Sequence, residues 1–219
     1  GEGYVAAKER VKAQLAEKSY LDMNCEGITE AIVGLANVAR AEGILELETL
    51  VDTASNDLLL TGIGLAVDGT EPELIQTILE TRTEYLVLHC VTTCRMMMEG
   101  FMSIQCNDNP RIVEQKLRAF YVAPPSKRSL FEGVSIDDLK TQVQNTPHTL
   151  WMFDEVTDLM TDASIVARWQ GVAALEPLVS LAKLKLLQLG LRLTVDEVEL
   201  ELTQNILETH LVHLEHHLM

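Results

Sequence analysis

The chain has few of the residues that favour β-sheets and few of those that interrupt helices. Aromatic residues make up 5% of its 219 residues, with only 12 glycines and 6 prolines. Leucine and alanine, which have high helix propensity, are abundant. This composition predicts an all-α protein, long enough to bury a sizeable core in one domain or in two small ones.

No apolar run is long enough to cross a bilayer. The most apolar stretch, Leu58 to Val67, has ten residues and contains two glycines, whereas a membrane-spanning helix needs about 20 residues. The polar N-terminal stretch does not show a signal-peptide pattern. The four cysteines, at positions 25, 90, 94 and 106, lack the spacing of a disulfide framework. We therefore expect a cytoplasmic protein with reduced thiols and no transmembrane helix.

Basic residues are also scarce. The chain has 17 lysines and arginines against 33 aspartates and glutamates, and its formal net charge is -16. Nucleic acids and anionic membranes both need a basic surface, so neither is expected as the main partner. A basic protein partner would suit this charge, although acidity can also serve only to keep a protein in solution.

An internal repeat organises the chain. Residues 28–48, ITEAIVGLANVARAEGILELE, align without a gap with residues 156–176, VTDLMTDASIVARWQGVAALE. The repeat offset is the distance from Arg40 to Arg168, and it also pairs Gly62 with Gly190. About a third of roughly 85 aligned positions are identical, which indicates a duplicated unit. We expect two tandem similar helical units related by a pseudo-two-fold duplication: residues 1–122, a proline-containing linker at 123–134, and residues 135–219.

Periodicity and capping signals predict the helices. In residues 26–41 an apolar stripe contains Ile28, Ile32, Leu35 and Ala39, and Gly43 ends or bends that helix. Further helices are expected at 44–52, at 57–67 and, as the longest, at about 71–103. Expected caps are Asn109, Ser135 with Asp138, and Thr194 with Glu197, and both tryptophans, Trp151 and Trp169, are expected to be buried.

Three separate blocks carry a family resemblance. They are RAEGILELE at residues 40–48, GIGLAVDGTEPELIQTILET at 62–81 and MEGFMSIQCNDNPRIVEQKLRAF at 98–120. In this order they resemble the cytoplasmic region of the flagellar stator subunit in the MotA/TolQ/ExbB proton-channel family. Residues 82–98 stand where that family has two membrane helices, which carry its ion path. The resemblance therefore implies a relative that does not conduct protons.

The resemblance also implies a set of partner-binding residues. In the family, an arginine and a glutamate of the pattern R-x-x-G-x-x-x-L-E face oppositely charged groups on the flagellar rotor switch protein FliG. Arg40 and Glu48 match these positions, and Arg168 and Glu176 match them in the second repeat. The implied function is protein–protein contact in or near the flagellar motor, as a rotor-facing surface, a scaffold or a regulator. Alternatively, each residue is an ordinary solvated charge on a helix.

Other functions stay open. His210, His213 and His217 share one helix face beside His216, and Cys90 and Cys94 are one turn apart, so a metal- or redox-responsive regulator is one alternative. A module for homo-oligomerisation is another. No catalytic triad, phosphate-binding loop or zinc signature is recognisable. We expect a non-enzymatic protein with no cofactor and no metal site.

Overall fold

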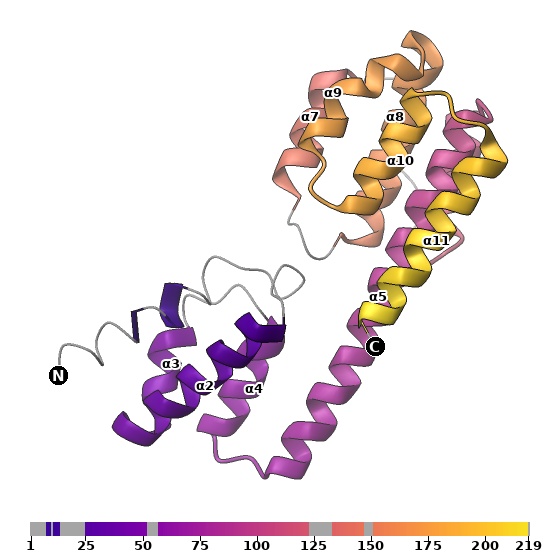
Figure 1. The fold of residues 1–219 in the computed structure, drawn as a ribbon. Coiled ribbons are helices and arrows are strands. Elements are labelled where there is room, and N and C mark those ends of the chain that lie inside the picture. Colours follow the sequence, from indigo (N-terminus) through magenta and orange to yellow (C-terminus); the bar gives the residue numbers. More distant parts are fainter. Residues whose placement is uncertain are drawn as a thin grey trace. The chain divides into compact units, whose positions relative to one another are not determined.

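The computed structural model describes residues 8–9, 11–13, 25–51, 57–122, 133–146 and 151–218. Figure 1 shows the helices along the chain. They are α2 (Cys25–Glu42), α3 (Glu46–Val51), α4 (Asp57–Val67), α5 (Pro72–Gln105), α6 (Pro110–Arg118), α7 (Ile136–Asn145), α8 (Phe153–Gln170), α9 (Glu176–Leu181), α10 (Lys185–Val195) and α11 (Leu200–Leu218), with a 3-10 helix, η1 (Val172–Leu175), before α9.

The protein is all-α, as the composition predicts. Within the described residues every regular element is a helix, and none of these helices combines the length and the apolar character that a bilayer crossing requires. The helix expected at about 71–103 is α5, which is indeed the longest described helix.

The chain forms two compact units, and the boundary between them falls within α5. The N-terminal unit comprises residues 1–86 and the C-terminal unit residues 87–219. The division into residues 1–122 and 135–219 is drawn from the repeat and not from compactness, and it stays a prediction. Most of its expected linker, residues 123–132, lies outside the described residues.

The N-terminal unit has a small apolar core. In it α3 contacts both α2 and α4. The described part of the unit contributes these buried residues to the core: Val11, Ala31, Leu35, Val38, Leu47, Leu50 and Ile63. Lys8 bridges α2 and α3 through ion pairs with Glu42, at 3.1 Å, and with Glu46.

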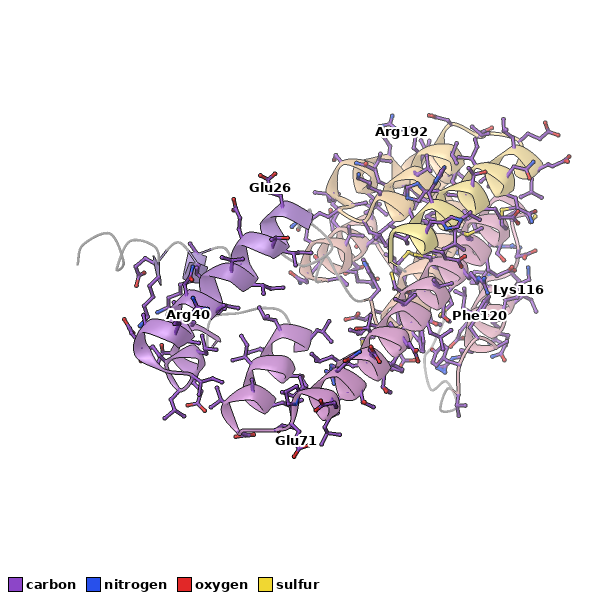
Figure 2. All side chains as sticks on the ribbon, turned by 60° about the horizontal axis from the view of Figure 1, so that its bottom comes forward. Glu26, Arg40, Glu71, Lys116, Phe120 and Arg192 are labelled. Carbon is purple, nitrogen blue, oxygen red and sulfur yellow. The ribbon has the colours of Figure 1, made fainter. Side chains whose placement is uncertain are left out.

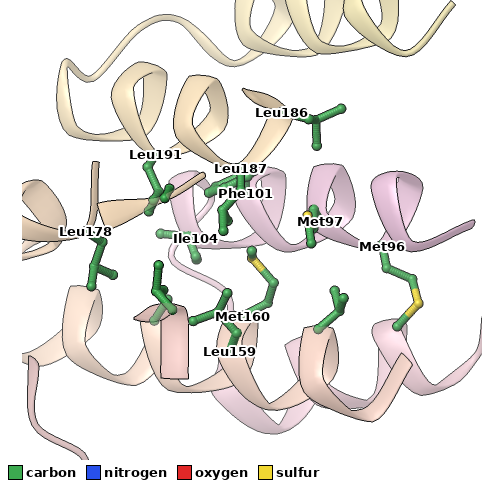
Figure 3. Packing of buried hydrophobic residues seen from close by; sticks show 14 of the residues in the cluster. Met96, Met97, Phe101, Ile104, Leu159, Met160, Leu178, Leu186, Leu187 and Leu191 are labelled. Atoms are coloured by element: carbon green, nitrogen blue, oxygen red, sulfur yellow. The ribbon is translucent and has the colours of Figure 1, made fainter. Parts of the chain in front are cut away.

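The C-terminal unit has a much larger core, which draws on α5 to α11. Figure 3 shows Met97 and Phe101 of α5 together with Leu187 of α10 and Met160 of α8. The helices approach closely where glycine leaves room. A Cβ atom on Gly190 would lie 2.1 Å from the Phe101 ring, and one on Gly100 would lie 2.5 Å from Met160 Cγ. Glycine is required at both positions because a methyl group would overlap these side chains.

The helix bounds of the two units correspond at the repeat offset. Cys25–Glu42 of α2 falls on Phe153–Gln170 of α8, and Asp57–Val67 of α4 falls on Lys185–Val195 of α10. The first residue of α5, Pro72, falls on the first residue of α11, Leu200. A duplicated unit predicts these coincidences, and the duplication itself remains a proposal.

Several expected caps can be checked. Asn109 accepts a hydrogen bond from the Arg111 amide, and Ser135 forms a capping box with Asp138, so both predictions are confirmed. The expected cap at Thr194 is wrong, because Thr194 lies inside α10 and its hydroxyl donates to the Gly190 carbonyl. Glu197 has a φ of 51° in the turn after α10, where Gly69 of the other unit has a φ of 73°. Both turns therefore have a residue with a positive φ at the equivalent position, although only one of the two residues is a glycine.

Candidate functional site

Arg40 and Glu48 flank the turn between α2 and α3. Arg40 lies in the last turn of α2 and Glu48 in the first turn of α3, and both side chains are exposed. A cation at a helix C-terminus and an anion at a helix N-terminus are each favoured by the helix dipole. Figure 2 shows Arg40 and Glu26 at opposite ends of α2.

The turn keeps the two charges apart. Gly43 has a φ of 94°, which L side chains rarely adopt, and its amide donates to the Ala39 carbonyl at 3.0 Å. Among the residues that the structure describes, neither Arg40 nor Glu48 has an ion-pair or hydrogen-bond partner for its side chain. Both charges are therefore displayed to solvent within the described part of the chain.

The neighbouring charges are already paired. Glu42 and Glu46 both bind Lys8. Hydrogen bonds to Glu46 and Glu42 raise the pKa of Lys8, and the hydrogen bond from Lys8 lowers the pKa of Glu46. Because Lys8 forms ion pairs with both carboxylates, it offsets part of the negative charge around Gly43.

Arg168 and Glu176 occupy the equivalent turn of the C-terminal unit. Gly171 has a φ of 86°, and Arg168 and Glu176 are exposed. Arg168, unlike Arg40, has a partner among the described residues: its Nη1 donates to the Asn107 carbonyl at 3.0 Å. The two arginines thus share a sequence position but differ in what they bind.

A shallow cavity of about 440 Å³ lies beside Arg168. Polar lining residues come from the end of α5, the turn after it, α8, α10 and the turn after α10: Gln105, Asn107, Asp108, Ser164, Arg168, Thr194 and Glu197. Gln105 is held in place by donating to the Val198 carbonyl and the Thr203 hydroxyl. We identify no nucleophile–base pair among these lining residues.

The residues expected for a metal or redox role are only partly described. No group of three or more potential ligands gathers among the described residues, and the His217 side chain lies outside them. Burial, followed by the nearby charges of Lys185 and His213, lowers the pKa of His210. Cys94 is buried, and its hydrogen bond with Cys90 raises the pKa of its thiol and lowers that of Cys90.

Some apolar residues that the sequence predicts to be buried are exposed in the structure. Ile28 and Ile32, part of the predicted α2 stripe, are 37% and 56% exposed, and Val33 beside them is 53% exposed. Trp169 is 81% exposed, so its predicted burial is wrong, whereas Trp151 is buried. The stripe of α2 is therefore split, with Leu35 inside the core and Ile32 outside it.

Comparison of the chain with protein-family models, with curated proteins and with solved structures finds no match.

Proposed function

We propose that the chain is a non-enzymatic helical interaction module, related to the cytoplasmic region of the MotA family, that acts by protein–protein contact in or near the flagellar motor. Its partner under this proposal is the rotor switch protein FliG, and its location is the cytoplasmic face of the motor. The assignment to the flagellar motor rests on the sequence resemblance alone.

One observation carries the proposal. Arg40 and Glu48 are exposed on either side of Gly43 and have no partner among the described residues, while Glu42 and Glu46 between them are paired with Lys8. Two unpaired charges of opposite sign, held apart by a defined turn, can meet complementary charges on another protein. Such contacts act mainly on association rate and partner choice.

The C-terminal unit contributes less to this contact. Arg168 already donates to the Asn107 carbonyl, so binding a partner through its guanidinium requires breaking or sharing that hydrogen bond. We therefore assign the partner contact first to Arg40 and Glu48, and second to Arg168 and Glu176.

The test is a binding titration of the full chain against the C-terminal domain of FliG at low and at high salt. Two charge-reversed variants are compared with the original chain: Arg40→Glu with Glu48→Lys, and Arg168→Glu with Glu176→Lys. We expect binding that weakens with salt and that falls by about tenfold in the first variant at low salt. The second variant serves as the matched control and should lose less.

Absence of binding to FliG at either salt concentration would reject the rotor-facing function. Equal losses in the two variants would reject the assignment of the contact to the N-terminal unit. In the first case, the chain would still be an interaction module, acting as a scaffold or regulator with a different protein partner.

A further inference from the structure

In the C-terminal unit, one face of α8 is covered by α5 and α6. Val156, Met160 and Thr161 of α8 are buried. Met160 touches α5 at Gly100, and α6 packs against α8 with its buried Val113 and Leu117. Burying apolar side chains of this size stabilises the packing of these helices. The α5–α6 segment is thus a structural cover for α8.

Polar contacts hold both ends of this cover. At the C-terminal end of α8, Arg168 donates to the carbonyl of Asn107, which lies in the turn between α5 and α6. Towards the N-terminal end, the hydroxyl of Tyr121, just after α6, donates to Asp154 Oδ1 at 2.6 Å and contacts Thr157 Oγ1 at 3.1 Å. These bonds fix the position of the cover along α8.

Among the residues that the structure describes, none covers the equivalent face of α2. At the repeat offset, Val156 corresponds to Ile28, Met160 to Ile32 and Thr161 to Val33. All three residues of α2 are exposed, although their side chains are apolar and one of the buried residues that they match is a threonine. We call this surface, which consists of Ile28, Ile32, Val33 and Ala36 and ends at Arg40, the α2 face.

The two faces are comparable because α2 and α8 sit in their own cores in the same way. Every buried core residue described in the N-terminal unit corresponds at the repeat offset to a buried core residue of the C-terminal unit. The pairs are Val11 with Leu139, Ala31 with Leu159, Leu35 with Ala163, Val38 with Val166, Leu47 with Leu175, Leu50 with Leu178, and Ile63 with Leu191. The helix surface left over by this core is therefore the same surface in both units.

The charges around the α2 face indicate which kind of partner can bind there. Between residues 25 and 86 the only basic residues are Arg40 and Arg82, whereas acidic residues recur on every helix, with Glu26 and Glu30 exposed on α2 itself. An apolar helix face flanked by carboxylates is complementary to an amphipathic helix that carries lysine or arginine beside its apolar side chains. In α6, Arg111, Lys116 and Arg118 provide such a pattern.

We propose that the α2 face binds a two-helix segment of a separate polypeptide, of the same type as α5–α6, with basic residues flanking its apolar side chains. Arg40 donates to a carbonyl in the turn of that segment, as Arg168 does to Asn107. This proposal rests on the proposed function, because it names the kind of partner segment that the Arg40 region receives. It adds an apolar contact to the electrostatic contact through Arg40 and Glu48.

A second copy of this chain is a less suitable occupant than a separate polypeptide. Its α5–α6 segment is already buried against its own α8, with Phe101, Val113 and Leu117 inside the core. Releasing the segment exposes these large apolar side chains to water, which is unfavourable. Two chains of net charge -16 also repel each other.

The test uses a fluorescently labelled peptide of residues 96–121, with the substitution Cys106→Ser, as a stand-in for the partner segment. The peptide is titrated into the full chain and binding is followed by fluorescence anisotropy. We compare the original chain with Ile32→Glu, which places a charge at the centre of the α2 face, and with Arg40→Ala. The matched control is Leu74→Glu, because Leu74 lies in the same unit and is 53% exposed, close to the 56% of Ile32.

We expect saturable binding that is weakened by about tenfold or more in Ile32→Glu, by a smaller factor in Arg40→Ala, and not in Leu74→Glu. Circular dichroism should show the same helix content in all variants, because these side chains are exposed. Absence of peptide binding overturns the proposal, and so does equal binding by the Ile32→Glu and Leu74→Glu variants. Light scattering that shows a dimer lost in Ile32→Glu also overturns it, in favour of a second copy.

The outcome is independent of the FliG titration. If the peptide binds the α2 face and FliG does not bind the chain, the proposed partner is wrong while the docking surface stands. If FliG binds through Arg40 and Glu48 while the peptide does not bind, the proposed function stands and the two-helix segment is rejected.

Discussion

Helices α2 and α8 have matching bounds and matching core residues, yet their outer faces differ. The outer face of α8 is buried under α5 and α6, and its terminal Arg168 holds the Asn107 carbonyl. The outer face of α2 is exposed, and its terminal Arg40 has no partner among the described residues. The same helical framework can therefore either complete its own fold or be left available for another protein.

The largest expected difference between the units is at Met160 and Ile32, which occupy equivalent positions. Met160→Ala removes a buried side chain and should destabilise the C-terminal unit by about 2–5 kcal/mol. Ile32→Ala removes an exposed one and should change stability by no more than about 0.5 kcal/mol. Urea unfolding followed by tryptophan fluorescence reports the first, since both tryptophans lie in the C-terminal unit, and circular dichroism reports the second. Similar losses in both variants would show that the α2 face is covered.

The next pair is Gly190 and Gly62. Gly190→Ala places a methyl group against the Phe101 ring and should destabilise the C-terminal unit by about 1–3 kcal/mol. Gly62→Ala meets only the end of the Leu79 side chain, 3.2 Å away, and gains helix propensity. We expect its unfolding free energy to stay within about 1 kcal/mol of the original value, as measured by urea titration. A neutral Gly190→Ala would show that Phe101 is not packed against α10.

The two arginines provide a smaller contrast. Arg168→Ala removes the hydrogen bond to the Asn107 carbonyl and should lower the stability of the C-terminal unit by about 0.5–1.5 kcal/mol. Arg40→Ala removes no contact among the described residues, so the unfolding free energy should not change measurably. Thermal unfolding of both variants at low salt tests this. An equal loss in Arg40→Ala would mean that Arg40 has an intramolecular role.

The smallest expected effect is a pH dependence that comes from His210 in the C-terminal unit. Burial, followed by the nearby charges of Lys185 and His213, lowers the pKa of His210 in the folded state, whereas the equivalent position of the N-terminal unit is an arginine, Arg82. Below about pH 6.5 His210 binds a proton more readily in the unfolded chain than in the folded unit. The contribution of His210 to stability is therefore complete above that pH and is lost on acidification.

His210→Gln should therefore reduce the loss of stability between about pH 7.5 and about pH 5.5, measured by urea unfolding at both values. An unchanged loss in His210→Gln would exclude His210 as its source. A gain of stability on acidification would contradict the direction that follows from a lowered histidine pKa.

Much of the local structure follows from local sequence. Asn109, and Ser135 with Asp138, predict helix starts because each offers a side-chain oxygen to an amide that lacks a partner in the helix. The prediction for Thr194 is wrong for a related reason. Its hydroxyl can accept from an amide that follows it or donate to a carbonyl that precedes it, and in α10 it donates to a preceding carbonyl.

The candidate site was predictable only in part. The repeat and the resemblance identify Arg40 and Arg168 together, but sequence cannot distinguish them, because the Asn107 carbonyl that binds Arg168 lies 61 residues away along the chain. Likewise, Ile32 belongs to a regular apolar stripe, and periodicity shows that a helix face is apolar without showing whether another helix covers it. Trp169 is misassigned for the same reason.

Hydrogen–deuterium exchange on the full chain alone tests most directly whether the α2 face is open. The comparison is between amides of residues 28–42 and those of residues 156–170, which are equivalent in the repeat. Because α8 is buried in the larger core and the described residues cover α2 on one side only, we predict clearly faster exchange in residues 28–42. Equally slow exchange in the two segments would contradict the account, since it would mean that α2 is as well covered as α8.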